Sequence, residues 1–445
     1  MRSWNDIPFD DLLAESRDGE WGKGEPEVGH TEAVVIRGTD FAGINDPEQN
    51  LPHRWIKDHL VKRKKLQSGD IVFEMAGGTS TQSTGRSALL KPSFFVRNAP
   101  FPAVCASFSR HLRLDQSRFC PEFIYYLLQT LHHSGYMDVF HIQHTGVARF
   151  QYSSFKKHTV LKIPPLPTQR KIAAILTAYD DLIETNKRRI ALLEKMAEEL
   201  YREWFVRMRF PGHQNTRFVK SVPEGWEMRK IEKAFDFTGG GTPSKNVPIY
   251  WNNGTVNWFT PSDITGAAGL FLSESETRCS EEGLARSSAK LFPPYSVMMT
   301  SRATIGAIGI NTTPACTNQG FITCIPNERY PLPYLYQWLK LAKPYFDALS
   351  GGATFPELTK GTFKKLEIMT PAEEVMHEFT KLSTPIFKSM QIGLEQNENL
   401  TKTRDLLLPR LISGKLSVEN LDIQFPPSMQ EETPEPESAY AELHL

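Results

Sequence analysis

Apolar residues recur at alternating spacings of four and three between Pro167 and Arg209. Such a heptad pattern predicts a long helix whose narrow apolar seam packs against a second helix. No Gly or Pro follows Pro167 within this stretch, so about 40 residues at 1.5 Å rise would span about 60 Å. Asn186 alone breaks the seam, and a buried polar residue there is expected to fix the register of pairing. The seam positions are Ile172, Leu176, Tyr179, Ile183, Asn186, Ile190, Leu193, Ala197, Leu200 and Trp204.

The same pattern returns about 207 positions later, between Pro371 and Leu411. Leu193-Glu194-Lys195 then corresponds to Leu400-Thr401-Lys402. This second stretch is the predicted partner of the first. Because Pro385 and Gly393 lie inside it, we expect a kink or a weaker first half there.

Each predicted long helix follows a segment of short strands. The strand-like and helix-like runs at 33–36, 70–73 and 122–131 have counterparts at 256–260, 294–300 and 332–342. Two halves of about 200 residues with the same order of elements indicate an internal duplication. We therefore predict an α+β protein with two globular domains separated by two long antiparallel coiled-coil helices. The predicted ranges are 1–166 and 211–370 for the globular domains, 167–210 and 371–420 for the helices, and 421–445 for a disordered, acidic, Pro-containing tail.

This symmetry suggests a protein that contacts two places on one elongated ligand, and duplex DNA fits. An antiparallel helix pair would relate the domains by a pseudo-two-fold axis, which matches the approximate dyad of the DNA backbone. Because the two domains differ in sequence, each is expected to read a different half of a bipartite, asymmetric site.

Composition limits the other possibilities. The chain has 51 basic and 51 acidic residues, so a nucleic-acid surface must come from local clusters rather than from net charge. No apolar stretch approaches a membrane span, and the first residues show no signal-peptide core, so we expect a cytoplasmic protein. Five scattered cysteines predict buried free thiols rather than disulfides or a zinc site.

Candidate DNA contacts lie in loops and one basic run. The run Lys62, Arg63, Lys64, Lys65 is either a phosphate contact or a solvated turn. Arg86, Arg149 and Arg302 lie in loops rich in small residues, from which Arg reaches guanine bidentately. Asn318 and Gln319 either read adenine or cap a turn. Lys245 and Lys360 are further phosphate candidates, whereas His141 and His144 are interpreted as ordinary loop histidines.

Apparent catalytic motifs do not have the required chemistry. Phe237-Thr238-Gly239-Gly240-Gly241 resembles an S-adenosylmethionine loop, but Thr242-Pro243-Ser244 follows where a helix should begin. Phe292-Pro293-Pro294-Tyr295 has Phe where a methyltransferase needs a hydrogen-bonding side chain. No Walker A sequence occurs. Catalysis is therefore expected in partner subunits, without a cofactor or metal in this chain.

Apolar residues near the end of the first long helix lie off its seam. Tyr201, Phe205 and Met208 are the candidates for docking another subunit, since a surplus apolar surface suits a partner helix. The charged residues along the same helix are typical of a solvated face.

Several segments resemble one known family. Ile163–Ile172, followed by the long helix, resembles the central conserved region of specificity (S) subunits of type I restriction-modification enzymes, and Arg404–Gly414 resembles their distal conserved region. The segments 223–226, 240–244 and 258–264 resemble the opening of their target-recognition domains, and 301–306 and 318–321 fit the same domain. The first half lacks these motifs, which is consistent with a different target sequence.

The resemblance implies a non-catalytic, DNA-reading subunit. It implies two methyltransferase (M) subunits that use S-adenosylmethionine, restriction (R) subunits that use ATP and Mg²⁺, a duplex DNA site and no membrane. Three alternatives remain open from the sequence: a methyltransferase acting alone, a coiled-coil scaffold without a DNA role, and an S-like subunit of a methylation-only or other phage-defence assembly.

Overall fold

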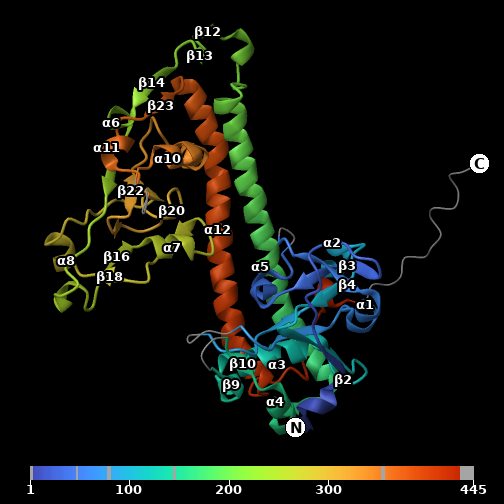
Figure 1. Cartoon of the computed structure of the whole chain (residues 1–445). Coiled ribbons are helices and arrows are strands. Elements are labelled where there is room, and N and C mark those ends of the chain that lie inside the picture. The colour runs from blue at the N-terminus through green and yellow to red at the C-terminus, as the bar shows by residue number, and fades with distance from the viewer. Residues whose placement is uncertain (1–3, 47–48, 78–81, 144–146, 352–355, 431–445) are drawn as a thin grey trace, which may run out of the picture. The chain divides into compact units, whose positions relative to one another are not determined.

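The computed structural model describes residues 4–46, 49–77, 82–143, 147–351 and 356–430. They form two compact units, Met1–Thr185 with Glu398–Leu445 (unit 1) and Asn186–Asn397 (unit 2). Each long helix, α5 (Leu166–Tyr201) and α12 (Glu373–Ile412), contributes one half to each unit (Figure 1). The expectations for His144 and for the tail beyond residue 430 lie outside the described residues.

The two helices pair antiparallel in both units, as the repeat predicted. In unit 2, Asn186 Nδ2 donates to Asn397 Oδ1 at 3.0 Å, and Ile190 packs directly on Gly393. In unit 1, the Arg404 guanidinium lies 2.6 Å from the Asp180 carboxylate. Asn186 is therefore the polar seam residue that the pattern indicated.

The expected interruption of α12 is absent. The helix continues through Pro385 and Gly393 to Ile412. Pro385 lies on the exposed side of the helix, and Gly393 is buried where the helices approach closely. A Cβ atom at Gly393 would lie 3.1 Å from Ile190, so packing against α5 explains the glycine.

The described part of unit 1 contains a four-stranded and a three-stranded sheet, besides the two-stranded pairs β1-β11 and β9-β10. The larger sheet has the order β2-β8-β5-β6 and is antiparallel; the smaller has the order β4-β3-β7, with β3 and β7 parallel. The pair β1-β11 leads into α5. The elements are β1 (Asn5–Pro8), β2 (Leu13–Asp18), β3 (His30–Ile36), β4 (His53–Lys57), α1 (Asp58–Lys64), β5 (Ile71–Glu74), β6 (Ser87–Leu89), α2 (Pro92–Asn98), β7 (Ala103–Cys105), β8 (Ser109–Leu114), α3 (Pro121–His133), β9 (His141–Ile142), β10 (Arg149–Phe150), α4 (Tyr152–His158) and β11 (Val160–Ile163).

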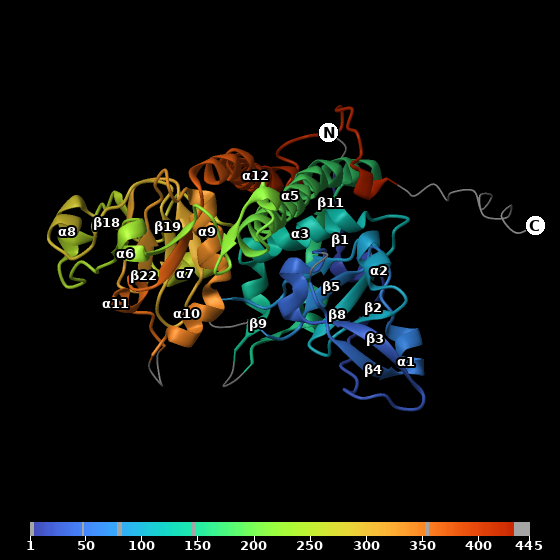
Figure 2. The same cartoon turned by 90° about the horizontal axis from the view of Figure 1, so that it is seen from above.

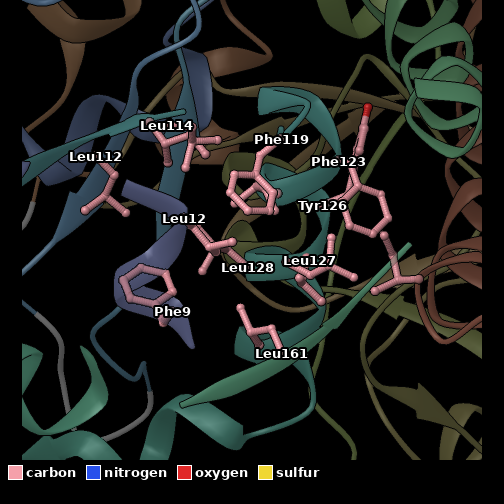
Figure 3. Close-up of a cluster of buried hydrophobic side chains, with 14 of the residues drawn as sticks. Phe9, Leu12, Leu112, Leu114, Phe119, Phe123, Tyr126, Leu127, Leu128 and Leu161 are labelled. Atoms are coloured by element: carbon pink, nitrogen blue, oxygen red, sulfur yellow. The ribbon is translucent and has the colours of Figure 1, made fainter. Parts of the chain in front are cut away.

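Helix α3 joins the sheet of unit 1 to the long helices. Its apolar face carries Phe123 and Leu127, which pack with Phe9, Leu12 and the sheet residues (Figure 3). The helix also lies beside α5 (Figure 2). Tyr126, which belongs to the same core, donates its hydroxyl to Asp180 of α5 at 2.6 Å. One continuous core therefore fixes this globular domain to its half of the helix pair.

Unit 2 repeats this topology around a core of its own. The larger sheet has the order β15-β22-β19-β20-β17, and the smaller has the order β18-β16-β21, with β16 and β21 parallel. The elements are β12 (Phe218–Val219), β13 (Val222–Pro223), β14 (Glu227–Lys230), α6 (Ile231–Ala234), β15 (Phe237–Gly239), β16 (Val256–Phe259), α7 (Pro261–Thr265), β17 (Phe271–Leu272), β18 (Arg278–Cys279), α8 (Glu281–Ala285), β19 (Val297–Thr300), β20 (Ile308–Asn311), β21 (Ala315–Thr317), β22 (Phe321–Cys324), α9 (Leu332–Leu341), α10 (Lys343–Leu349), α11 (Lys360–Phe363) and β23 (Glu367–Thr370).

One turn shows the duplication at the level of single hydrogen bonds. After β3, the Arg37 backbone N–H donates to Asp40 Oδ2 at 2.8 Å. After β16, the Thr260 backbone N–H donates to Asp263 Oδ2 at 2.7 Å. Both carboxylates cap a short helical turn in the same way, so the correspondence predicted between these two segments is confirmed.

Two further expectations have different outcomes. All five cysteines are buried free thiols, as predicted. The tail, expected to be disordered from residue 421, is instead packed on unit 1 as far as Gln430. Leu421 O accepts from Lys171 Nζ at 2.7 Å, Ser428 hydrogen-bonds to Asp181, and Met429 packs against the core. The apolar residues Ile423 and Met429, which pack against the unit 1 core on either side of Pro426 and Pro427, explain why this part of the tail is ordered.

Candidate nucleic-acid interface

One edge of the unit 2 sheet brings distant loops together. The register pairs Gly239 with Ile322 and Thr300 with Phe321, so β15 and β19 end where β22 begins. Backbone hydrogen bonds tie the adjoining loops to one another, from Gly241 N to Thr317 O at 2.9 Å and from Ser301 N to Gly320 O at 2.7 Å. We call this edge, with residues 239–242, 301–302, 318–320 and 357–360, the unit 2 loop edge.

Four of the predicted contact residues lie on this edge. Gln319 Oε1 accepts from Thr242 Oγ1 at 2.7 Å, which links Gln319 to the glycine-rich loop. The Lys360 side chain lies over Gly239, where a Cβ atom would come 1.9 Å from Lys360 Cε. A side chain at 239 would therefore displace the end of the lysine from this place. Asn318 and Arg302 complete the group.

Arg302 has a carboxylate partner that sequence reasoning missed. Its Nε lies 2.9 Å from Glu357 Oε1, and the arginine side chain is 51% exposed. The two residues also face each other across an isolated antiparallel bridge. No local pattern marks Glu357, because it comes from a segment 55 positions further along the chain.

Asn318 and Lys245 differ from the other candidates. Asn318 Oδ1 accepts from Gly320 N at 2.8 Å, so its side chain holds the tight turn between β21 and β22. This favours the turn-capping interpretation over base reading. Lys245 is exposed in the loop before the short helical turn Pro248–Tyr250, outside the loop edge as defined here.

Unit 1 has the equivalent edge with different side chains. The register pairs Asp18 with Arg110 and Glu74 with Ser109, so β2 and β5 end where β8 begins. Met75 N donates to Phe108 O at 2.8 Å, as Ser301 N does to Gly320 O in unit 2. We call residues 75–77, 108 and 147–149 the unit 1 loop edge.

The equivalence extends to the loop at 147–149 in unit 1 and the loop at 357–360 in unit 2. Phe150 N donates to Met75 O at 2.8 Å, and Leu358 N donates to Ser301 O at 2.9 Å. Arg149 bridges Ala76 in unit 1, as Glu357 bridges Arg302 in unit 2. The exposed Arg149 thus occupies the position that a glutamate holds in unit 2. The two loop edges therefore share one pattern of backbone hydrogen bonds, which we call the backbone frame, while the charged side chains on it differ.

Two predicted basic contacts are held by carboxylates of their own domain. Arg86 binds Glu74, which is 1% exposed, and donates to Gly38 O at 3.2 Å. The hydrogen bonds that Arg86 donates to the Glu74 carboxylate raise the pKa of Arg86. Lys64 donates to Gly19 O at 2.9 Å and to Glu20 at 3.2 Å. The structure therefore does not support Arg86 and Lys64 as free contacts, whereas Lys62, Arg63 and Lys65 are exposed around the end of α1.

The predicted docking residues are not available at the surface. Tyr201 is 5% exposed and Phe205 6%, and both belong to the core of unit 2. The Phe205 ring lies 4.9 Å from the rings of Tyr334 and Phe379, and burial raises the pKa of Tyr201. Met208 packs against the same core. These off-seam residues pack within their own unit, so the structure does not support the prediction.

The apparent catalytic motifs have structural roles. The glycines after Phe237 follow strand β15 without opening a helix, and Phe292 is 2% exposed in a core cluster. His141 Nδ1 accepts from Thr84 N at 3.1 Å, a loop contact as expected. Within the described ranges, no group of His, Cys, Asp and Glu is suited to bind a metal ion, and no helix has the length and apolarity to span a membrane.

Comparison with known proteins identifies the family to which this chain belongs. The type I restriction modification DNA specificity domain matches twice, over residues 40–195 and 223–400. The chain belongs to this family and carries two copies of its domain. The resemblance in the sequence is thereby confirmed, and the match does not favour a methyltransferase acting alone or a scaffold without a DNA role.

Individual relatives agree with the family. The chain is 31% identical over 201 residues to the type I restriction enzyme MjaIX specificity subunit of Methanocaldococcus jannaschii, covering 45% of this chain and 46% of that protein. It is 26% identical over 359 residues to the HindI specificity subunit of Haemophilus influenzae, covering 66% and 77%. The crystal structure of a type I S subunit from M. genitalium has the same fold, with a TM-score of 0.56 at 16% identity over 92% of this chain and 96% of that one.

Proposed function

We propose that this chain is the sequence-specific DNA-binding subunit of a type I restriction-modification complex and has no catalytic role itself. Each recognition domain reads one half of a bipartite, asymmetric duplex site through its loop edge, and the helices set the spacing. The observation that supports this most directly is the shared backbone frame of the two loop edges with different side chains on it. Such a frame presents different donors and acceptors to the grooves of one DNA duplex.

In unit 2, Arg302, Gln319 and Lys360 have distinct parts in this function. Arg302 hydrogen-bonds a guanine edge bidentately, Gln319 reads an adenine edge, and Lys360 contacts a phosphate. Glu357 holds Arg302 in place before binding. In unit 1, Arg149 has the reading role, and Lys62, Arg63 and Lys65 contribute phosphate contacts. Lys245 contributes a further phosphate contact in unit 2.

The partner surface of this proposal differs from the one that the sequence indicated. On α5, Leu192 is 63% exposed and Met196 57%, and on α12, Ile392 is 43% exposed. Each directly precedes a residue of the helix seam, and such positions on two antiparallel helices share one side of the pair. Glu194, one position after Leu193, instead faces Lys340 of the recognition domain at 2.7 Å. The exposed apolar side is therefore free of that domain.

We assign this surface to a methyltransferase (M) subunit. Two such subunits per chain supply S-adenosylmethionine chemistry, and restriction (R) subunits supply ATP- and Mg²⁺-dependent cleavage. The chain's own residues bind, orient and space the DNA.

Duplex binding by the purified chain tests the proposal. The logarithm of affinity for a duplex selected from random sequence should fall linearly with the logarithm of salt concentration, and selected duplex should bind more tightly than unselected duplex. A chain that shows no salt-dependent binding to any duplex, alone or with a co-expressed methyltransferase subunit, would contradict it.

A further inference from the structure

An aromatic ring projects from the unit 1 loop edge. Phe108 lies between β7 and β8 and is 63% exposed, which is the largest exposed fraction of any phenylalanine among the residues that the structure describes. Its counterpart by backbone hydrogen bonding is Gly320, which has no side chain. At this shared backbone position the two loop edges therefore differ by an aromatic ring.

The backbone that carries Phe108 is fixed on both sides. The Phe108 carbonyl accepts from Met75 N at 2.8 Å and from Ala76 N at 3.2 Å. Ser109 N donates to Ala106 O at 2.8 Å, and Ala106 N donates to Ile36 O at 2.8 Å. A ring on such a turn loses little backbone freedom when it binds, because the backbone is already ordered.

The neighbours of the ring suit nucleic acid. Val147, 59% exposed, and the exposed Arg149 lie on the loop that bridges Ala76. An exposed ring with an adjacent cation combines an apolar contact for bases with a charge for phosphates. Single exposed apolar residues are common on protein surfaces. This one, however, lies on a loop edge whose backbone hydrogen bonds correspond to those of the unit 2 loop edge.

We propose that Phe108 inserts between two stacked base pairs of the half-site read by unit 1, a contact for which the described residues of the unit 2 loop edge supply no aromatic ring. The proposal rests on the proposed function and adds the way in which one recognition domain contacts the bases. Insertion of an apolar wedge partly unstacks a base step and bends the duplex. Unit 1 then selects its half-site partly through the ease of unstacking that step, while the described residues of the unit 2 loop edge select by hydrogen bonds.

Permanganate reactivity of thymines tests insertion directly, since permanganate attacks unstacked thymines. The substrate is duplex recovered by selection with the full chain and any methyltransferase subunit that co-purifies. We expect wild-type protein to create a reactive thymine in one half-site only. Phe108→Ala should remove that reactivity and weaken binding to the selected duplex by about tenfold, without changing affinity for unselected duplex.

Matched variants separate the possible outcomes. Phe218→Ala removes another exposed phenylalanine, 44% exposed in β12, and should change neither readout. Phe108→Trp should retain the reactive thymine. Reactivity that persists in Phe108→Ala, or weaker binding without any reactive thymine in wild type, would overturn the inference. If Arg302→Ala impairs selection while Phe108→Ala does not, the inference fails and the proposed function stands; if neither variant matters, the proposed function fails too.

Discussion

Asn186 and Asn397 form a side-chain hydrogen bond across the paired halves of α5 and α12 in unit 2, with 3.0 Å between Nδ2 and Oδ1. Apolar seam positions tolerate small shifts along a helix, whereas two amides satisfy each other in one register only. This pair therefore selects the register in which the helices support their recognition domains.

Replacing one asparagine should cost more than replacing both. Asn186→Leu leaves the Asn397 amide without its partner at a half-buried position, and we expect a loss of about 1–2 kcal/mol. Asn186→Leu with Asn397→Leu restores an apolar seam and should be at least as stable as wild type. Urea unfolding of Asn186→Leu, Asn397→Leu and the double variant measures this, and simple additivity of the two single changes would contradict the proposed pairing.

Asp180 is the second polar contact that we expect to matter for stability. Its carboxylate accepts from Arg404 at 2.6 Å and from the Tyr126 hydroxyl at 2.6 Å, so it joins α12, α5 and α3. Arg404 and Asp180 side chains are about a quarter exposed, which reduces the cost of breaking the pair.

We expect Asp180→Ala to destabilise unit 1 by about 1–3 kcal/mol, because it leaves the partly buried Arg404 guanidinium with only the exposed Asp405 and the buried Tyr126 hydroxyl with only a 3.4 Å contact to Thr177. Thermal unfolding measures the change. Glu398→Ala, which removes an exposed pair with Lys402 on the same helix half, is the control and should have little effect. Equal effects of the two variants would argue against a special role for Asp180.

Arg302→Ala should weaken binding to selected duplex by about 1–3 kcal/mol and relax one base position in a single half-site. Arg229 is the matched control, since it forms an ion pair with Glu227 at a similar exposure in β14. Competition binding with single-base variants of the duplex gives both readouts. Equal losses on selected and random duplex would make Arg302 a phosphate contact instead.

Glu357→Gln distinguishes a holding role from a reading role. If Glu357 only holds Arg302, the glutamine variant should keep the base preference while affinity shifts modestly. A change in preference at a cytosine would show that the carboxylate itself accepts from the base.

The helix surface predicted to bind a methyltransferase subunit can be altered without changing the fold. Leu192→Glu combined with Met196→Lys places an i,i+4 pair of good helix formers on the exposed side of α5. We expect loss of co-purification with the subunit and an unchanged melting temperature. Leu291→Glu, at a 54% exposed residue of the same unit, is the control. Retained co-purification would place the docking surface elsewhere.

The long helices could be predicted because a heptad seam is a local, repeating signal. Asn186 was recognised for the same reason, whereas Asn397 was not, since Pro385 and Gly393 obscured the second repeat. Pro385 is tolerated on the exposed side of α12, and Gly393 is packed against Ile190. Whether a Pro or a Gly interrupts the helix at these two positions depends on tertiary contacts, which the periodicity of the sequence does not reveal.

The individual site residues were harder to predict. Arg86 and Lys64 are residue types that commonly contact DNA. In the structure, however, they form ion pairs with Glu74 and Glu20, which come from other segments of the chain. Tyr201 and Phe205 seemed surplus to the helix seam, yet the core of unit 2 covers them. Loop composition indicated Arg302 as a candidate, and the structure places it with Lys360 on the unit 2 loop edge; that these residues contact DNA stays a prediction. Phe108 gave no sequence signal, since exposure follows from the fold.

Selection of bound duplex from random sequence, followed by the same selection with Arg302→Ala and with Arg149→Ala, tests most directly whether each domain reads its own half-site. We predict two dissimilar half-sites at a fixed spacing, with Arg302→Ala altering only one half and Arg149→Ala only the other. A single uninterrupted site, or one variant that alters both halves, would contradict the account.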